Sequence, residues 1–549
     1  MSFIQQTLNY ISAFGPGYTL RRLVEKVSER VFRRWDRAWR ESYAPREEEL
    51  QRQRGAQPDC GLISVLIPVY QTEPALLSAL LDSLAAQTLA GWEAVLALAG
   101  DRAETAAALE SYAARDARFR VVPLPRNEGI SGNTNQALAA ARGAWVVLCD
   151  HDDTLPPDAL WRLGEEIARG RADVIYTDED KLTPDGKRHT DPHFKPDFSP
   201  DNLRSGNYIC HLLAAKKSLV EAAGGLRPGF DGSQDHDLVL RLSERTDAIV
   251  HLPFIGYHWR TLSSSMSHQH LEKCLDAAAR ATQEQMARIG WPGRVTVENG
   301  LLRLRYELRP LTGAVWILAA AEADGEAARR CLEPVLPAGF PIRVRVFGRE
   351  EARAAAMNAA AAESREELLL FVDASLPLFS RGFWEELAMY AQREDVGMVT
   401  PMLVDTRSRV THAGFAVGGP RGAVCRNLGL PGRAAGWHLL NRQSHNVGAV
   451  SAACLMVRRA AWEPLDTDLP CPAAVIAACA RMSARGLRHV YTPWAVAMCE
   501  RADLLLTREG LPEDARTRLR ARLGDWADPC WNPNLSLDKG NFTFRRQKP

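Results

Sequence analysis

The chain has 549 residues, of which 46% are hydrophobic, and a formal net charge of +1 at pH 7, so it can form two or three domains and gives no reason to expect a nucleic-acid partner. It contains no run of about 18 apolar residues and no signal-peptide pattern after Met1, so neither a transmembrane helix nor secretion is expected. The eleven cysteines form no CxxC pair and no cluster with zinc spacing, so we expect reduced thiols in a cytoplasmic protein.

Residues 1–58 are predicted to be a basic helical segment followed by a linker. Between residues 20 and 40, apolar side chains recur at helical spacing, from Leu20 to Trp35, and arginines crowd the other faces. Such a helix can lie on an anionic membrane. It can equally pack on the next domain with its charged face in solvent. The sequence leaves both open, and the first predicts peripheral contact with the inner face of the cell membrane.

Residues 59–305 are predicted to form an α/β domain with a mainly parallel sheet. Short apolar, β-branched runs alternate with helical ones, which is typical of this class. Strands are expected at 62–70, 92–99, 119–124, 144–150, 172–182 and 249–260, and helices at 74–87, 104–116, 133–143 and around 234–244. Ligands of such sheets bind beyond the carboxyl ends of the strands, where Asp150 is expected.

A second α/β series occupies residues 306–505, before a turn-rich, extended segment at 506–549. When Asn135 is placed on Asn358 without gaps, Asp150 meets Asp373. At a second offset, residues 241–253 meet 481–493 with five of thirteen positions identical. These matches indicate a duplicated domain.

The two halves differ mainly at residues suited to chemistry. Each of the following acids or histidines of the first half is replaced in the second: Asp152 by Ser375, Asp153 by Leu376, Asp235 by Val475, Asp237 by Ala477 and His258 by Met498. The residues expected to pack remain apolar or small. We therefore expect a second domain that has kept the fold and lost the reaction.

Two acidic stretches of the first half are candidates for catalysis. The run from Asp150 to Asp153 offers carboxylates to Mg²⁺ or Mn²⁺, which are commonly shared with phosphates; the alternative is that Asp153 caps the next helix. Asp235 and Asp237 open a predicted helix, where acids are favoured by the helix dipole, or one of them is a general base. His258 follows a strand and is either a metal ligand or a structural residue.

The first half resembles the family 2 glycosyltransferases, which have the nucleotide-sugar-binding fold called GT-A. The resemblance rests on "ISVLIPVYQTEPALLSALLDSLAAQT", "RNEGISGNTNQALAAARGAWVVLCDHDD", "YTDEDKL", "DPHFKPDFSPD", "NYICHL", "GSQDHDLVLRL" and "YHWR", from about Ile63 to Arg260. The whole chain is similar to a tandem subgroup of bacterial surface polysaccharide synthesis, through "HAG" at His412, "NVGAVSAACLMVRR" and "DPCWNPNLSL". The resemblance therefore implies two tandem GT-A domains, of which the second is degenerate.

The resemblance implies a role for each matched residue. The catalytic base would be Asp235, and the metal ligands Asp152, Asp153 and His258. The nucleotide sugar would contact Pro68, Tyr70, Asn127, Gly129, Asn135 and Asp150. The acceptor side would include Asp180, Lys195, Asn207, His211 and Asp237. The family often has an acid after the second strand that reads the nucleobase, whereas this chain has Leu98 to Gly100 and then Asp101, which leaves the nucleotide open.

The expected reaction is inverting and metal-dependent. It moves a sugar from a nucleotide-diphosphate sugar, with dTDP-rhamnose or a UDP-sugar as donor, to a glycan, a lipid-linked or a glycoprotein acceptor. Two other functions stay open. One is a non-catalytic glycan-binding or scaffold protein, which suits the second half. The other is a sugar-phosphate nucleotidyltransferase, whose glycine-rich phosphate loop is missing from "IPVYQTEP".

Overall fold

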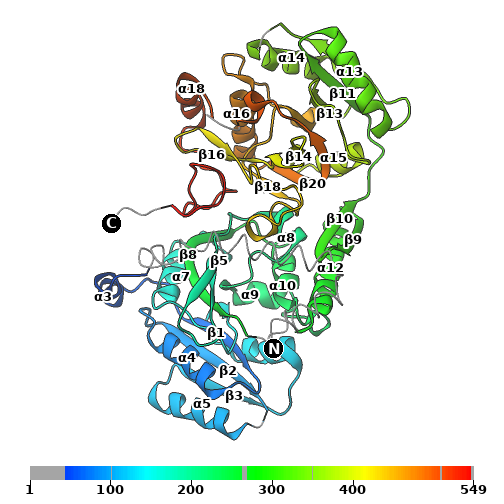
Figure 1. Ribbon diagram of the computed structural model, residues 1–549. Helices are drawn as coiled ribbons and strands as arrows, with labels where there is room; N and C mark the ends of the chain where they lie inside the picture. Colours follow the sequence, from blue (N-terminus) through cyan, green and yellow to red (C-terminus); the bar gives the residue numbers. More distant parts are fainter. Residues whose placement is uncertain (1–43, 101, 263–268, 349, 507–509, 546–549) are drawn as a thin grey trace.

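The computed structural model describes residues 44–100, 102–262, 269–348, 350–506 and 510–545. They form two sheet-containing lobes, joined by a long helix and a hairpin (Figure 1). The expected helix at residues 20–40 and the side chain of Asp101 lie outside the described residues. No helix within the described part of the chain is long and apolar enough to cross a bilayer. All eleven cysteines are free thiols.

The first lobe is a three-layered α/β domain whose central sheet has the order β3-β2-β1-β4-β7-β5-β6, with β8 beside β5. Its strands are β1 Ile63–Val69, β2 Trp92–Ala99, β3 Phe119–Leu124, β4 Trp145–Leu148, β5 Val174–Leu182, β6 His189–His193, β7 Leu213–Lys216 and β8 Ile249–Arg260. Its helices are α3 Glu47–Gly55, α4 Pro74–Ala85, α5 Ala103–Arg115, α6 Gly129–Ala140, α7 Ala159–Ala168, α8 Pro200–Ser205, α9 Lys217–Ala222, α10 Gln234–Leu242 and α12 Leu271–Arg288.

The core of this lobe lies on both faces of its sheet. Apolar residues of α4 and α7, such as Leu81 and Leu160, pack with Val65 on one face. Residues of α6, α10 and α12, such as Leu138 and Leu240, pack on the other. The helical period of apolar residues in each helix creates the stripe that the sheet covers.

Two strands of the mainly parallel sheet, β6 and β7, run antiparallel to their neighbours. β1, β2, β3 and β4 are parallel, and so are β5 and β8, but β7 runs antiparallel between β4 and β5. The segment before β7, from Asn207 to His211, lies beside Asp150, which follows β4, and both line one cavity between the lobes. The chain therefore enters β7 from the carboxyl end of β4 and has to run back along it.

The second lobe repeats this topology. Its sheet order is β12-β11-β13-β19-β14-β20-β18, with β15 beside β14. Its strands are β11 Gly313–Ala319, β12 Ile342–Val346, β13 Leu368–Asp373, β14 Val396–Val404, β15 Val410–His412, β16 Phe415–Val417, β17 Ala423–Cys425, β18 His445–Val447, β19 Cys454–Arg458 and β20 Arg488–Met498. Its helices are α13 Glu322–Leu332, α14 Glu350–Glu363, α15 Phe383–Ala391, α16 Cys471–Ala484, α17 Ala502–Leu505 and α18 Glu513–Leu523.

The two sheets correspond strand by strand. The run β2-β1-β4-β7-β5-β8 of the first matches β12-β11-β13-β19-β14-β20 of the second, and β19 is antiparallel to β13 and β14 as β7 is to β4 and β5. The duplication predicted from the sequence is thus confirmed in the topology.

Two segments join the lobes. The hairpin of β9 Gly293–Glu298 and β10 Leu301–Tyr306 places Leu302, Leu304 and Tyr306 in the core of the second lobe. The C-terminal segment after α18 crosses back to the first lobe at the junction (Figure 1), where Asp197 donates its backbone N–H to the carbonyl of Pro529. This segment follows the turn-rich pattern expected of it, with an isolated bridge between Leu535 and Phe544.

Candidate active site

A cavity of about 2930 Å³ lies between the lobes. Its first wall comes from the carboxyl ends of β1 and β4 and the starts of α6 and α10, and its second from residues 417–443 and 526–545. Pockets for single small ligands are usually about 300–1,000 Å³. The cavity therefore has room for more than one ligand.

Five of the six residues expected to contact the nucleotide sugar line this cavity: Pro68, Tyr70, Asn127, Gly129 and Asp150. Pro68 and Tyr70 stand at and just beyond the end of β1, and Asn127 and Gly129 at the start of α6. Gly129 has a φ of +79°, and a Cβ there would lie 2.6 Å from the carboxylate of Asp231. Glycine is required at this turn on both counts.

Asn135 does not line the cavity. Its side chain bridges the backbone of Leu226, donating to the carbonyl at 2.8 Å and accepting from the N–H at 2.9 Å. Asn358, its counterpart, makes the same pair of bonds to Leu465 at 2.9 and 2.8 Å. We therefore correct the expected contact between Asn135 and the donor sugar: this asparagine fixes a loop, which explains why both halves retain it.

Asp150 and Asp152 line the cavity. The side chain of Asp150 is 37% exposed, and one oxygen lies 3.8 Å from Nε2 of His211. Enclosure by the protein raises the pKa of Asp150, His211 opposes this shift, and the neighbouring Asp152 carboxylate adds to it. Crowded carboxylates of this kind favour a bound cation.

Asp153 is buried and does not line the cavity, although it follows Asp152 directly. Its carboxylate accepts hydrogen bonds from the hydroxyl of Tyr257 and the backbone N–H of Arg260, both at 2.6 Å. It thereby ties the acidic loop to β8. A carboxylate oxygen of Asp153 still lies within 4.8 Å of ligand atoms of Asp150 and His211, a grouping that could hold a metal ion.

Asp235 and Asp237 point in different directions from the first turn of α10. Asp235 lines the cavity, and its Oδ2 accepts a 2.7 Å hydrogen bond from the side-chain amide of Asn207. Asp237 is fully buried between Arg227 and Arg241, and hydrogen bonds from both arginines hold its pKa below the usual value despite burial. The expected acceptor-side role of Asp237 is therefore corrected to a structural ion pair.

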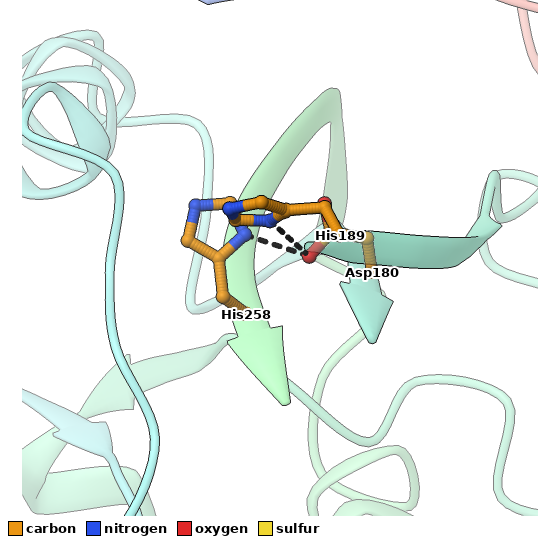
Figure 2. Close-up of side chains that lie close together, drawn as sticks. All are labelled: Asp180, His189 and His258. Carbon is orange, nitrogen blue, oxygen red and sulfur yellow. Dashed lines mark hydrogen bonds and ion pairs between the residues drawn. The ribbon is translucent and has the colours of Figure 1, made fainter. Parts of the chain in front are cut away.

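His258 contacts a different set of residues from those expected. Its Nδ1 lies 2.7 Å from Oδ1 of Asp180, whose Oδ2 lies 3.0 Å from Nδ1 of His189. Figure 2 shows both imidazoles converging on this carboxylate from β6 and β8. None of the three residues lines the cavity between the lobes. Asp180, expected on the acceptor side, is 3% exposed.

Lys195 is fully buried and cannot contact an acceptor directly. Its ammonium donates to Glu179 at 3.2 Å and to the backbone carbonyls of Ile209 and His211. Glu179 also accepts the backbone N–H of His211 at 3.0 Å. The Lys195–Glu179 pair therefore positions His211, whose ring stacks on Tyr257 with centroids 4.5 Å apart.

Asn207 and His211 do line the cavity, where His211 faces Asp150; their expected contact with an acceptor stays a prediction. Glu179, one of the acids of "YTDEDKL" for which a substrate-side role is expected, and Asp231, which sequence reasoning missed, also line it. The density of acids in "YTDEDKL" pointed to the region of Glu179, but the alternation of strand faces was needed to separate it from Asp180. Asp231 carried no recognisable signal.

Among its described residues, the second lobe has no equivalent of the acidic site. Asp373, the counterpart of Asp150, is ion-paired with the buried Arg353 and also accepts a 2.9 Å bond from the backbone N–H of Ser375. Arg353 occupies the alignment position of Ile130, which lines the cavity in the first lobe. Val475 and Ala477 are buried in the core. The retained aspartate is neutralised from within the chain.

Comparisons with known proteins agree with this difference between the first and second lobes. The model of the family described as "Glycosyl transferase family 2" matches residues 64–219. The chain is 34% identical to an uncharacterized protein, y4gI, of Sinorhizobium fredii, over 94% of this chain and 62% of that protein. It is 30% identical to the O-antigen biosynthesis protein RfbC of Myxococcus xanthus, over 88% of this chain and 41% of that protein. The chain thus spans about two-fifths to three-fifths of these relatives' lengths.

Among solved structures, residues 1–349 of S. aureus TarS in complex with UDP are similar at a TM-score of 0.34 and 18% identity, over 41% of this chain and 65% of that one. A score this low decides nothing about this chain, whose own sheets define its architecture. The sequence match covers the lobe whose strand ends form the first wall of the cavity. Residues 64–219, within the first lobe, match the glycosyl transferase family 2 model, and the second lobe repeats the sheet topology of the first.

Proposed function

We propose that the protein is an inverting, metal-dependent glycosyltransferase that moves a sugar from a nucleoside-diphosphate sugar to a hydroxyl group of an acceptor. The observation that carries this proposal is the placement of Asp235 in the same cavity as Asp150 and Asp152. One carboxylate is thus available for an acceptor hydroxyl, while two others face the donor side. A binding protein or scaffold needs no such division.

In this reaction the acceptor oxygen attacks the anomeric carbon as the bond to the diphosphate breaks. Asp235 takes the hydroxyl proton, and the nucleoside diphosphate leaves with the bonding electrons. Asn207 fixes Oδ2 of Asp235, and no hydrogen bond to Oδ1 is found among the described residues. We therefore assign Oδ1 as the oxygen that accepts the proton of the acceptor hydroxyl. Attack opposite the leaving group inverts the linkage.

The donor set fits a hard divalent cation such as Mn²⁺ or Mg²⁺. Asp150 and Asp152 bring carboxylates to one wall, and the Nδ1 atom of His211 has no hydrogen-bond partner among the described residues. Asp153 and His258 would have to release their present partners to act as ligands. A cation held there would offset the charge that develops on the departing diphosphate.

The donor, the acceptor and the cellular location of the reaction are proposed from the relatives and the sequence. The relative in M. xanthus is named for O-antigen biosynthesis, and we accordingly propose a surface glycan as product. dTDP-rhamnose and UDP-sugars are the donors to try first, and glycan, lipid-linked and glycoprotein hydroxyls the acceptors. We place the reaction in the cytoplasm, with residues 20–40 as the segment for peripheral contact with the inner face of the membrane.

The test is donor hydrolysis and transfer by the full chain, with Mn²⁺ or Mg²⁺ and a panel of nucleotide sugars. Asp235→Asn should lower the rate by about 10²–10⁴-fold, because it removes a positioned base, while nucleotide binding is kept. Asp237→Asn is not a matched control because it breaks a buried ion pair; Asp276→Asn, at an exposed aspartate of α12 outside the cavity wall, is better. Parent-like turnover by Asp235→Asn would refute the base assignment.

A further inference from the structure

A lysine in the cavity wall rests on the face of a tryptophan. The ammonium of Lys181 lies 2.9 Å from the ring centroid of Trp259. The two residues are register partners on β5 and β8, and both line the cavity. Cation–π contacts of this kind hold an ammonium in place without neutralising its charge.

The charge of Lys181 has no dedicated partner. Among the described residues, its ammonium makes no recorded hydrogen bond or ion pair, whereas Lys195, Lys216 and Lys217 each pair with a carboxylate. Glu179 acts on Lys181 through space, but its Oε2 is already engaged by Lys195 and by the backbone of His211. A half-buried cation in this state is suited to an anion from outside the chain.

Lys181 stands beside the acidic site. The ring of Trp259 lies 5.5 Å from that of His211, and His211 faces Asp150 at 3.8 Å. The lysine and the candidate cation site therefore belong to one stretch of wall. A ligand with an anionic group could be held by both.

The second lobe has lost this arrangement together with the acids. The last register pair of β14 and β20, Val404 with Met498, is equivalent to Asp180 with His258. One residue further, Asp405 and Cys499 stand where the first lobe has Lys181 and Trp259. Neither the lysine nor the tryptophan is retained at these two positions. The fold that the two lobes share therefore does not require this pair.

We propose that Lys181, held by Trp259, is an anion-binding residue that recognises a phosphate or carboxylate group of a ligand in the cavity. The proposal rests on the proposed function, which leaves two sources for this group: the diphosphate of the donor, or an acidic group on the acceptor glycan. A lysine ammonium is a compact point charge on a flexible stem, so it can follow such a group as the reaction proceeds.

The experiment measures binding by isothermal titration calorimetry to the full chain and to Lys181→Met, Lys181→Gln and Lys181→Arg variants. Lys187→Met is the control, because Lys187 is exposed on the same β5–β6 hairpin and does not line the cavity. The donor arm uses inorganic diphosphate with Mn²⁺, and UDP against uridine. The acceptor arm uses glucuronic acid and glucose 6-phosphate against glucose, at saturating UDP.

A donor diphosphate predicts that Lys181→Met weakens inorganic diphosphate and UDP by about 10-fold or more, as for a lost charge-assisted hydrogen bond, and leaves uridine unchanged. An acidic acceptor predicts instead that only glucuronic acid or glucose 6-phosphate is weakened. In both cases Lys181→Arg should keep most of the affinity and Lys187→Met all of it.

Parent-like binding of every anion by folded Lys181→Met or Lys181→Gln overturns the proposal. Equal losses in Lys181→Met and Lys181→Arg also overturn it, because they indicate a packing role. These outcomes are separate from the failure of the proposed function, which is read from turnover: a parent protein that transfers and hydrolyses no nucleotide sugar refutes the glycosyltransferase, whatever Lys181 binds.

Discussion

The side-chain amide nitrogen of Asn532 lies 3.0 Å from each carboxylate oxygen of Asp178, 354 residues earlier in the chain. It also donates to the backbone carbonyl of Lys195 at 2.8 Å. Asp178 and Asn532 are both buried. The C-terminal segment thus completes a polar network inside the first lobe, next to the Lys195–Glu179 pair that positions His211.

Replacing Asn532 should therefore destabilise the first lobe. Asn532→Ala leaves a buried carboxylate without one of its donors, which costs about 1–3 kcal/mol. Urea unfolding measures the loss. Asn541→Ala is the control, because Asn541 is exposed in the same C-terminal segment and accepts a hydrogen bond from the hydroxyl of Thr543, and it should change stability by a few tenths of a kcal/mol. Equal stabilities of the two variants would contradict the role of Asn532.

His251 couples the same network to pH. Burial opposes its charged form, but the carboxylate of Asp178, 2.9 Å from Nε2, outweighs burial, and the pKa of His251 is raised. A group whose pKa is raised by folding contributes stability that is present below its unfolded pKa, near 6.5, and is lost as the pH rises through the folded value.

We therefore expect the parent protein to lose stability, relative to His251→Gln, as the pH is raised from about 6 to 9. The measurement is the difference in free energy of unfolding between the two proteins at each pH. Taking this difference removes the contributions of the other histidines. A difference that is constant over the range would show that folding does not raise the pKa of His251.

Asp201 and Arg393 form an ion pair across the two lobes, with each side chain 1% exposed. Asn446 also donates to Asp201 at 2.8 Å. Arg393→Met should cost about 3 kcal/mol, because it removes the nearer of the two arginines beside the buried Asp201 and leaves Arg204 at 3.5 Å. Adding Asp201→Asn should restore part of this loss. The double-mutant cycle is measured by thermal or urea unfolding.

Arg305→Met is the control for this cycle, since the Arg305–Glu298 pair is exposed and such pairs contribute about 0–1 kcal/mol. If Arg393→Met proved no worse than Arg305→Met, the pair would not hold the lobes together. A second unfolding transition in Arg393→Met, absent from the parent, would identify the lobe junction as the site of the damage.

The matched asparagines Asn135 and Asn358 give a prediction about the two halves. Each makes two hydrogen bonds to one loop residue, so Asn135→Ala and Asn358→Ala should lose similar stability, about 1–3 kcal/mol. Asn358→Ala should leave transfer unchanged at temperatures where it is folded. If Asn135→Ala lost much less stability than Asn358→Ala and also lost diphosphate binding, Asn135 would be a donor-binding residue after all.

Six of the eight sheet strands of the first lobe could be predicted from the sequence because local periodicity sets them, whereas β6 and β7 were not predicted. The same local pattern located Asp150 beyond β4 and Asp235 in the first turn of α10, and both face the cavity. The duplication was also readable, since Asn135 and Asn358 keep the same local role. These features depend on residues close to one another in the chain.

Only the tertiary structure decided which way the remaining side chains point. Lys195, Asp237 and Asn135 have the residue types of a binding site, yet each is engaged by the protein itself. The contacts that determine this come from distant segments, as in the pairing of Asn532 with Asp178. A sequence pattern specifies which face of a helix or strand is apolar, whereas the partner of a polar group depends on which distant segments the whole fold brings beside it.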